Sequence, residues 1–180
     1  MLLSRKRVRR KERCHNAQLS GSEKYYKYCY SYKNMKQEPH HIFVYGSLRS
    51  GFHHPAYEYI SRYFLFEGNA KIKGVLFDMG TYPAAMPATG EHYIIGELYS
   101  IKKAEEFSWA MGQLDDYEGV DAEEEESVLF KRELANVYTG ENKNIKAWVY
   151  WYNGDTTGKP VIASGDVLDY FYKKNNNPAV

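Results

Sequence analysis

One glutamate in the sequence stands where helical spacing calls for an apolar residue. Glu118 lies four residues after Leu114 and seven after Met111, so periodicity places its carboxylate on the apolar stripe of a predicted helix. Asp115 and Asp116 are expected to point elsewhere. Burial disfavours the charged form of a carboxyl group and raises its pKa toward neutrality, as a general acid/base requires. The alternative is a frayed last turn that leaves the side chain in water.

A second set of candidate residues is the glycine-bearing segment Tyr45 to Gly51, which follows a strand-like apolar run. Glycine permits positive φ angles and close approach, so successive backbone N–H groups can converge on an anion or on a carbonyl oxygen that develops negative charge. The segment lacks the G-x-G-x-x-G pattern of dinucleotide sites and the Gly-Lys-Ser/Thr of a Walker loop. Ser47 lacks the Gly-x-Ser-x-Gly context of a nucleophile, so a turn hydroxyl is its more common role.

Arg132 is the third candidate. It shares one face of a predicted strand with Phe130 and Leu134, and a guanidinium that points inward needs carboxylate or carbonyl partners. It is either an internal brace, the more common role, or a clamp for substrate.

A metal site has little support, because the histidines occur as adjacent pairs or alone, without a partner four residues away. The acidic run Glu123 to Glu126 is typical of a solvated loop.

Short elements must position these residues. Apolar, β-branched and aromatic runs predict strands over residues 41–45, 70–78, 93–101, 128–138 and 145–152. Helical spacing predicts helices over 55–64, 102–118 and 166–173, with Gly119 as the stop signal of the second. The turn-rich segment Thr139 to Asn142 predicts an antiparallel hairpin. The class is therefore α+β, and the small sheet should curl or close because few strands otherwise leave unpaired edges.

Charge is unevenly distributed along the 180 residues. The whole chain carries a formal net charge of +1, but residues 1–38 hold eleven Lys or Arg against three Glu. We expect a basic, disordered tail at 1–38, one domain at 39–174 and a frayed end at 175–180.

Both cysteines lie in the tail, so the domain can form neither a disulfide framework nor a cysteine zinc site. No apolar run is long enough for a transmembrane helix, and we expect a cytoplasmic protein.

The tail leaves alternatives open. Residues 25–33 interleave tyrosine with lysine, which suits stacking on nucleic-acid bases or lying along a sheet edge. Without a recognised nucleic-acid module around it, a solvated or partly docked tail is the more common interpretation, and we expect no nucleic-acid partner. A third interpretation places the start of the protein at Met35, with residues 1–34 either outside the reading frame or without a part in the chemistry.

Seven segments, in order, resemble the landmarks of the gamma-glutamylcyclotransferase-like family, which includes gamma-glutamylamine cyclotransferases and the plant avirulence-induced (AIG2-like) proteins. The first segment, Phe43 to Arg49, contains the Tyr-Gly-Ser/Thr-Leu signature of that family. The others are GVLFDMG (74–80) with YPA (82–84), GELY (96–99), LDDYEG (114–119), FKR (130–132), AWVY (147–150) and SGD (164–166). Each is weak alone, but seven in the family's order over residues 42–170 are specific.

The resemblance implies a small mixed β-barrel with flanking short helices, a small-molecule gamma-glutamyl substrate and no cofactor. The cavity would lie between a glycine turn and a catalytic glutamate that matches Glu118. Tyr150 and Arg132 are further candidates for lining the pocket. The turn, whose backbone N–H groups would hold the substrate, matches Tyr45, Gly46, Ser47 and Leu48.

The implied reaction is an intramolecular cyclisation of the acyltransferase or lyase type. The α-amine of a γ-glutamyl group attacks its own γ-carbonyl, closes the ring of 5-oxoproline and releases an amine or amino acid, with Glu118 as general acid/base. Two departures from the family pattern, Phe130 for a tyrosine and Val167 for a tryptophan, bear on substrate preference more than on fold. The alternative is a non-catalytic module that binds gamma-glutamyl compounds or other small metabolites; an inward, unused carboxylate argues against it.

Overall fold

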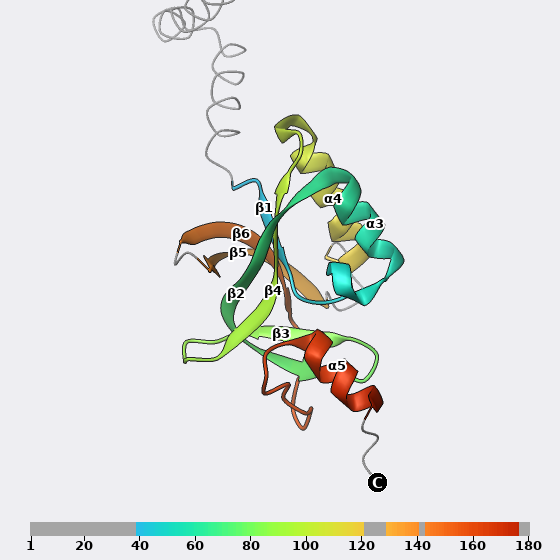
Figure 1. Ribbon diagram of the computed structural model, residues 1–180, viewed down its shortest axis with the longest axis vertical. Helices are drawn as coiled ribbons and strands as arrows, with labels where there is room; N and C mark the ends of the chain where they lie inside the picture. The colour runs from blue at the N-terminus through green and yellow to red at the C-terminus, as the bar shows by residue number, and fades with distance from the viewer. Residues whose placement is uncertain (1–38, 121–128, 141–142, 177–180) are drawn as a thin grey trace, which may run out of the picture. The chain divides into compact units, whose positions relative to one another are not determined.

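The computed structural model describes residues 39–120, 129–140 and 143–176, which lie in the compact unit Pro39–Val180. Its strands are β1 (His41–Val44), β2 (Phe64–Asp78), β3 (Pro83–Pro87), β4 (Tyr93–Ile101), β5 (Phe130–Thr139) and β6 (Asn144–Tyr152) (Figure 1). Its helices are α3 (Pro55–Tyr63), α4 (Phe107–Glu118) and α5 (Val167–Asn176), with 3-10 turns η1 (Ser50–Phe52) and η2 (Ala104–Glu106). The predicted basic tail and the acidic run at 121–126 lie outside the described residues.

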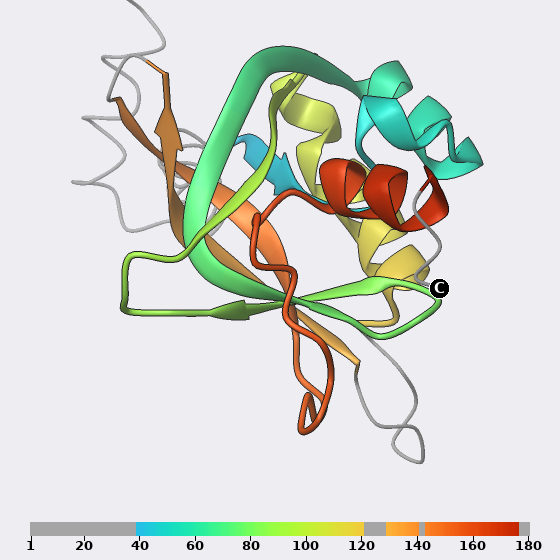
Figure 2. The same ribbon diagram turned by 60° about the horizontal axis from the view of Figure 1, so that its bottom comes forward.

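Five of the strands form a closed barrel. They are hydrogen-bonded in the order β2, β4, β1, β6, β5, and β5 pairs back with β2, where Val137 lies opposite Ile72. β1 runs parallel to β6, with Ile42 opposite Trp148, whereas the other strand pairs are antiparallel. The barrel is therefore mixed, and the predicted class, including the β5–β6 hairpin, is confirmed. β3 extends the sheet along the far end of β2 (Figure 2).

β2 is longer than predicted because a bulge lets it bend around the barrel. Its register against β4 shifts between Phe66 and Gly68, and Gly68 has a φ of 138°, which glycine tolerates. The strand therefore continues through residues 64–69, whose sequence breaks the apolar alternation. One strand can then pair with β4 along most of its length, with β5 at its middle and with β3 at its end.

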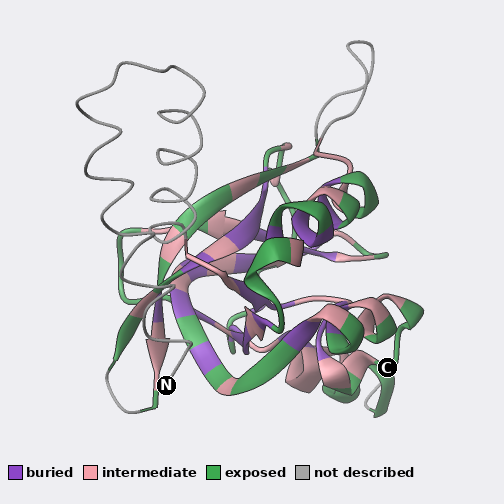
Figure 3. Cartoon of the chain, turned by 90° about the horizontal axis from the view of Figure 1, so that it is seen from above, coloured by how far each residue is buried: buried purple, intermediate pink, exposed green. Residues whose placement is uncertain are grey.

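Buried and exposed residues alternate along the strands (Figure 3), and the buried ones form two hydrophobic clusters. All five barrel strands contribute to the first cluster, which fills the barrel and includes Phe43, Ile72, Leu98, Val137 and Val149. The second lies between the outer face of the sheet and the helices α3 and α4. It includes Ile42, Val44, Ile60, Met111, Leu114 and Tyr150. α3 and α4 lie side by side (Figure 1), and the Tyr59 hydroxyl of α3 donates to the Ala110 carbonyl of α4 at 3.0 Å.

Besides β2, further elements differ from the prediction. The predicted helix 102–118 opens with the 3-10 turn η2, so α4 begins at Phe107. β3 was not expected, because prolines stand at both of its ends; as an edge strand it tolerates them. α5 continues to Asn176, two residues into the segment expected to be frayed, where the Asn176 amide donates to the Tyr172 carbonyl at 2.8 Å.

Candidate active site

The glycine turn after β1 presents unused backbone donors. The Arg49 N–H donates to the Gly46 carbonyl at 2.9 Å, which closes a tight turn. The N–H groups of Gly46, Ser47 and Leu48 donate to no acceptor in the described part of the chain. Tyr45 and Leu48 are buried, so their side chains anchor the turn while its backbone remains available. Such an arrangement can bind an anion or a developing oxyanion.

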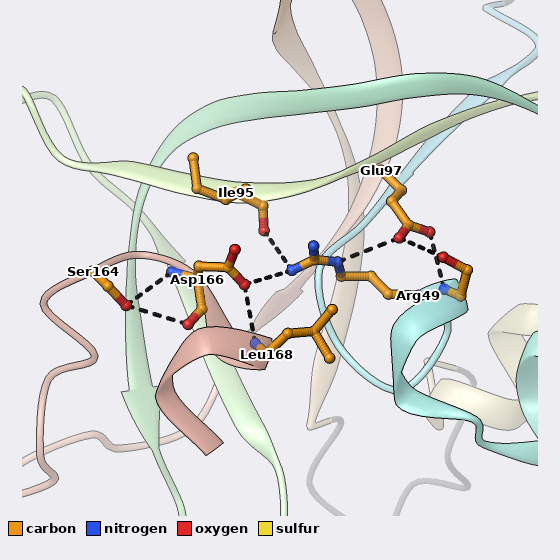
Figure 4. A network of polar contacts seen from close by, with 7 residues as sticks. Arg49, Ile95, Glu97, Ser164, Asp166 and Leu168 are labelled. Atoms are coloured by element: carbon orange, nitrogen blue, oxygen red, sulfur yellow. Dashed lines mark hydrogen bonds and ion pairs between the residues drawn. The ribbon is translucent and has the colours of Figure 1, made fainter. Parts of the chain in front are cut away.

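A buried arginine fixes this turn to the rest of the barrel (Figure 4). Arg49 Nη1 lies 2.8 Å from Asp166 Oδ1, and its Nε lies 3.7 Å from Glu97 Oε1. The same Glu97 carboxylate accepts from the backbone and hydroxyl of Ser50, at 3.0 and 2.8 Å, and from the Tyr99 hydroxyl at 2.6 Å. The landmarks GELY and SGD therefore supply the acids that hold the arginine after the turn.

Gly165 explains why SGD needs its glycine. Its φ is 67°, and a Cβ built there would lie 1.9 Å from the Tyr93 carbonyl oxygen. Its carbonyl accepts from the Ile95 N–H at 2.8 Å, so the chain passes directly against β4. This close approach brings Asp166 within reach of Arg49.

Glu118 is the last residue of α4, and Gly119 ends the helix as predicted. Gly119 has a φ of 68°, and its N–H bonds to carbonyls of the preceding turn. The Glu118 side chain is partly buried, and this burial raises its pKa from 4.5 to about 7. Its charge also contributes to the raised pKa values of the hydroxyls of Tyr45 and Tyr150. The carboxylate is therefore desolvated and close to two tyrosines, one of them the first residue of the turn.

Both tyrosine hydroxyls donate to fixed acceptors. The Tyr45 hydroxyl donates to the Tyr150 carbonyl at 2.8 Å, and the Tyr150 hydroxyl donates to Asp115 Oδ1 at 2.8 Å. Burial is the main reason that the pKa of each hydroxyl is raised, so both remain protonated. These contacts join β1, β6 and α4 beside Glu118.

Arg132 lies on the outer side of the barrel. On β5, Arg132 shares a face with Leu134, which is half-exposed. Val137 belongs to the opposite face and lies in the barrel interior. Arg132 Nη1 lies 3.2 Å from Asp115 Oδ2, and the guanidinium lies 4.9 Å from the Trp148 ring centroid. Arg132 thus has the carboxylate partner that a guanidinium turned toward the fold needs, and these contacts favour the brace over the clamp.

Asp115 was not among the candidate residues predicted from the sequence, and neither were the side chains of Arg49, Glu97 and Asp166. Asp115 was expected to point away from the apolar stripe, but it is buried and pairs with Arg132 and Tyr150. The signal was present: Asp115 lies four residues after Met111, so it also falls near the stripe. Asp116 is exposed, as expected.

Two cavities lie near the barrel. One of about 210 Å³ adjoins the glycine turn; its lining includes Leu48, Tyr59, Leu114 and Tyr117. The Tyr117 hydroxyl lies 3.3 Å from Ser47 Oγ, so α4 contacts the turn at this cavity. A larger groove of about 690 Å³ lies between η1, the β2–β3 turn and α5 and shares no lining residue with the site.

Within residues 39–120, 129–140 and 143–176, no three His, Cys, Asp or Glu side chains gather closely enough to hold a metal ion. None of the helices that the structure describes is long and apolar enough to cross a membrane.

Comparison with known proteins gives the family. The family model described as "Gamma-glutamyl cyclotransferase, AIG2-like" matches residues 42–169, from β1 to the first turn of α5. The chain belongs to this family. Membership confirms the resemblance and the expectation of an enzyme of gamma-glutamylcyclotransferase type.

Individual relatives agree with the fold of this AIG2-like chain. A Methanocaldococcus jannaschii protein named "Putative gamma-glutamylcyclotransferase" is 28% identical over 131 residues, which are 72% of this chain and 97% of that protein. YkqA from Bacillus subtilis has a TM-score of 0.55 at 22% identity over 79% of this chain, which spans only 44% of YkqA. An aig2-like protein from Mus musculus has a TM-score of 0.51 at 23% identity, over 68% of this chain and 85% of that one.

The two departures from the cyclotransferase pattern have different surroundings. Phe130 joins an aromatic cluster, with ring centroids 5.6 Å from Tyr152 and 6.1 Å from Tyr82. A Cβ built at Gly46 would lie 3.5 Å from the Pro83 side chain, so the segment that carries Tyr82 borders the turn. Val167 is fully buried in the barrel cluster. Only Phe130 therefore belongs to a group of side chains that extends toward the site.

Proposed function

We propose that this chain converts a gamma-glutamyl amine or peptide to 5-oxoproline and releases the amine or amino acid. The observation that carries the proposal is Glu118: a desolvated carboxylate with a pKa near 7, whose charge acts on Tyr45, the first residue of a turn with unused backbone donors. A group with that pKa exchanges protons readily near neutral pH, because both of its forms are populated there. Family membership supports the same reaction type.

In the proposed reaction, the ionised Glu118 accepts a proton from the α-ammonium group of the substrate. The freed amine nitrogen bonds to the γ-carbonyl carbon, and the carbonyl oxygen becomes an oxyanion. The N–H groups of Gly46, Ser47 and Leu48 stabilise this charge or hold the substrate's carboxylate. Glu118 then returns the proton to the leaving nitrogen as its bond to carbon breaks and the carbonyl re-forms. The ring nitrogen still carries two hydrogens at this point, and it gives one of them to the ionised Glu118. Glu118 passes this second proton to the released amine, which leaves as its ammonium form.

The fold contributes mainly by holding the substrate curled. The nucleophile and the carbonyl belong to one molecule, so the turn and Glu118 need only keep the reacting atoms close. Well-oriented intramolecular reactions gain up to about 7–11 kcal/mol relative to reactions between separate molecules. This is why the reaction needs no covalent enzyme intermediate.

Replacement of one residue tests the proposal. We expect Glu118→Gln to abolish 5-oxoproline formation from a panel of γ-glutamyl amines, amino acids and peptides, because glutamine keeps the shape but cannot transfer the proton. Calorimetry should show that the variant still binds the best donor. Asp116→Asn, an exposed carboxylate two residues away, is the matched control and should keep wild-type turnover.

Turnover by Glu118→Gln would remove Glu118 from the mechanism. Binding of donors by the wild-type protein without any product would support instead the non-catalytic binding module.

A further inference from the structure

The hydrogen bonds around Tyr150 determine what its hydroxyl can offer to a ligand. A phenol has one proton to donate and lone pairs that accept. The Tyr150 proton is directed to Asp115 Oδ1, 2.8 Å away, and the residue is buried. The charge of Glu118 reaches the same hydroxyl. Toward Glu118, therefore, the Tyr150 oxygen can act only as an acceptor.

The pairing of Asp115 with a cation favours its role as the acceptor of this proton. Arg132 lies 3.2 Å from its other oxygen, and the guanidinium is itself held over the Trp148 ring. A protonated Asp115 could donate to Tyr150 and reverse the hydrogen bond, which would turn the phenol into a donor. The ion pair thus fixes the direction of the hydrogen bond.

An acceptor beside a carboxylate suits a cationic N–H donor. The α-ammonium group of a γ-glutamyl substrate has three N–H bonds: one can give its proton to Glu118, and a second can donate to the Tyr150 oxygen. Two fixed contacts would orient the nitrogen toward the γ-carbonyl. A tyrosine that donated at this position would instead repel the ammonium group.

We propose that Asp115 and Arg132 are positioning residues that hold the Tyr150 hydroxyl as an acceptor for the α-ammonium group of the substrate. The proposal rests on the function proposed above. It separates two candidates that the sequence had grouped: Tyr150 touches the substrate, whereas Arg132 acts on it only through Asp115.

A double-mutant cycle tests the proposal. Asp115→Asn, Tyr150→Phe and the double variant are compared with the wild-type protein by kcat and KM for 5-oxoproline formation. We expect each single replacement to lower kcat/KM by about tenfold or more, and the double variant to match Tyr150→Phe within about twofold. Asp115 would then act only through Tyr150. Asp116→Asn, on the same helix but exposed, is the control.

Further variants separate positioning from folding. Arg132→Lys keeps the charge and should retain more kcat/KM than Arg132→Gln. Because loss of one partner leaves a buried charge unpaired, the combined Asp115→Asn, Arg132→Gln variant removes both charges and should fold. Thermal unfolding shows whether this combined variant folds. We expect the folded Asp115→Asn, Arg132→Gln variant to lose as much kcat/KM as Asp115→Asn alone.

Three outcomes would overturn the proposal. Additive losses in the first cycle would mean that Asp115 does not act through Tyr150, and wild-type kcat/KM in the folded Asp115→Asn, Arg132→Gln variant would mean that the pair is only a brace. In both cases a wild-type protein that forms 5-oxoproline leaves the proposed function standing. If the wild-type protein cyclises no donor, the proposed function and the positioning role fall together.

Discussion

The charged form of Glu118 is disfavoured by folding. The pKa of this carboxyl rises from 4.5 to about 7 because the folded chain removes it from water. The folded state therefore holds the Glu118 proton more tightly than the unfolded chain does. This contribution to stability is fully present below about pH 4.5 and is lost as the pH rises through about 7, by about 3 kcal/mol in total.

Glu118→Gln should consequently be more stable than the wild-type protein in alkaline solution. Glutamine resembles the protonated acid at every pH, so it avoids the penalty of a desolvated charge. We expect its free energy of unfolding to exceed the wild-type value by up to about 3 kcal/mol near pH 8.5, and to match it near pH 4.5. Urea unfolding at the two pH values measures this difference. Equal stability at pH 8.5 would mean that the carboxylate is well solvated.

At the scale of elements, the Arg49 network joins the glycine turn, β4 and the start of α5. We expect Arg49→Met to lower the free energy of unfolding by about 3 to 5 kcal/mol, because it leaves the buried Glu97 carboxylate without its cation. It should also raise KM, since the turn loses its anchor. Denaturant unfolding and steady-state kinetics measure the two effects.

The control for Arg49→Met is Lys103→Met, which breaks the exposed Lys103–Glu106 pair at the start of α4. That change should leave both stability and KM nearly unchanged. If Arg49→Met behaves in the same way, the network does not hold the turn.

Elements with a strong local signal could be predicted from the sequence. Apolar spacing and the stop at Gly119 placed α4 and the inward Glu118, and turn residues placed the β5–β6 hairpin. β3 could not be predicted, because its prolines are tolerated only at the edge position that the finished sheet gives it.

Contacts between distant segments were the harder part of the site. The Asp115–Arg132 and Arg49–Asp166 pairs join residues far apart in the chain, and spacing along one element carries no information about them. The family landmarks include these segments, but they do not predict which side chains form the ion pairs.

At the scale of the whole molecule, residues 39–176 supply, in their described part, two extensive hydrophobic clusters. We expect a chain that begins at Met35 to keep the wild-type melting temperature within a few degrees and the same kcat/KM. Thermal unfolding and the 5-oxoproline assay measure this. A large loss of either would show that residues 1–34 contribute to the domain. Salt-sensitive binding to nucleic acid that disappears with those residues would support the alternative role of the basic tail.

The parallel β1–β6 pairing has a consequence for synthesis on the ribosome. Tyr45 leaves the ribosome about a hundred residues before Tyr150, whose carbonyl its hydroxyl must reach. Until β6 emerges, the nascent chain has β1 and the turn but no closed barrel around them. Pairings across long sequence separations form slowly. The Tyr150 hydroxyl, which is the acceptor in the proposed site, should therefore be among the last groups to reach its final position. A chain that stalls before β6 would therefore have every residue of the turn and no functional site.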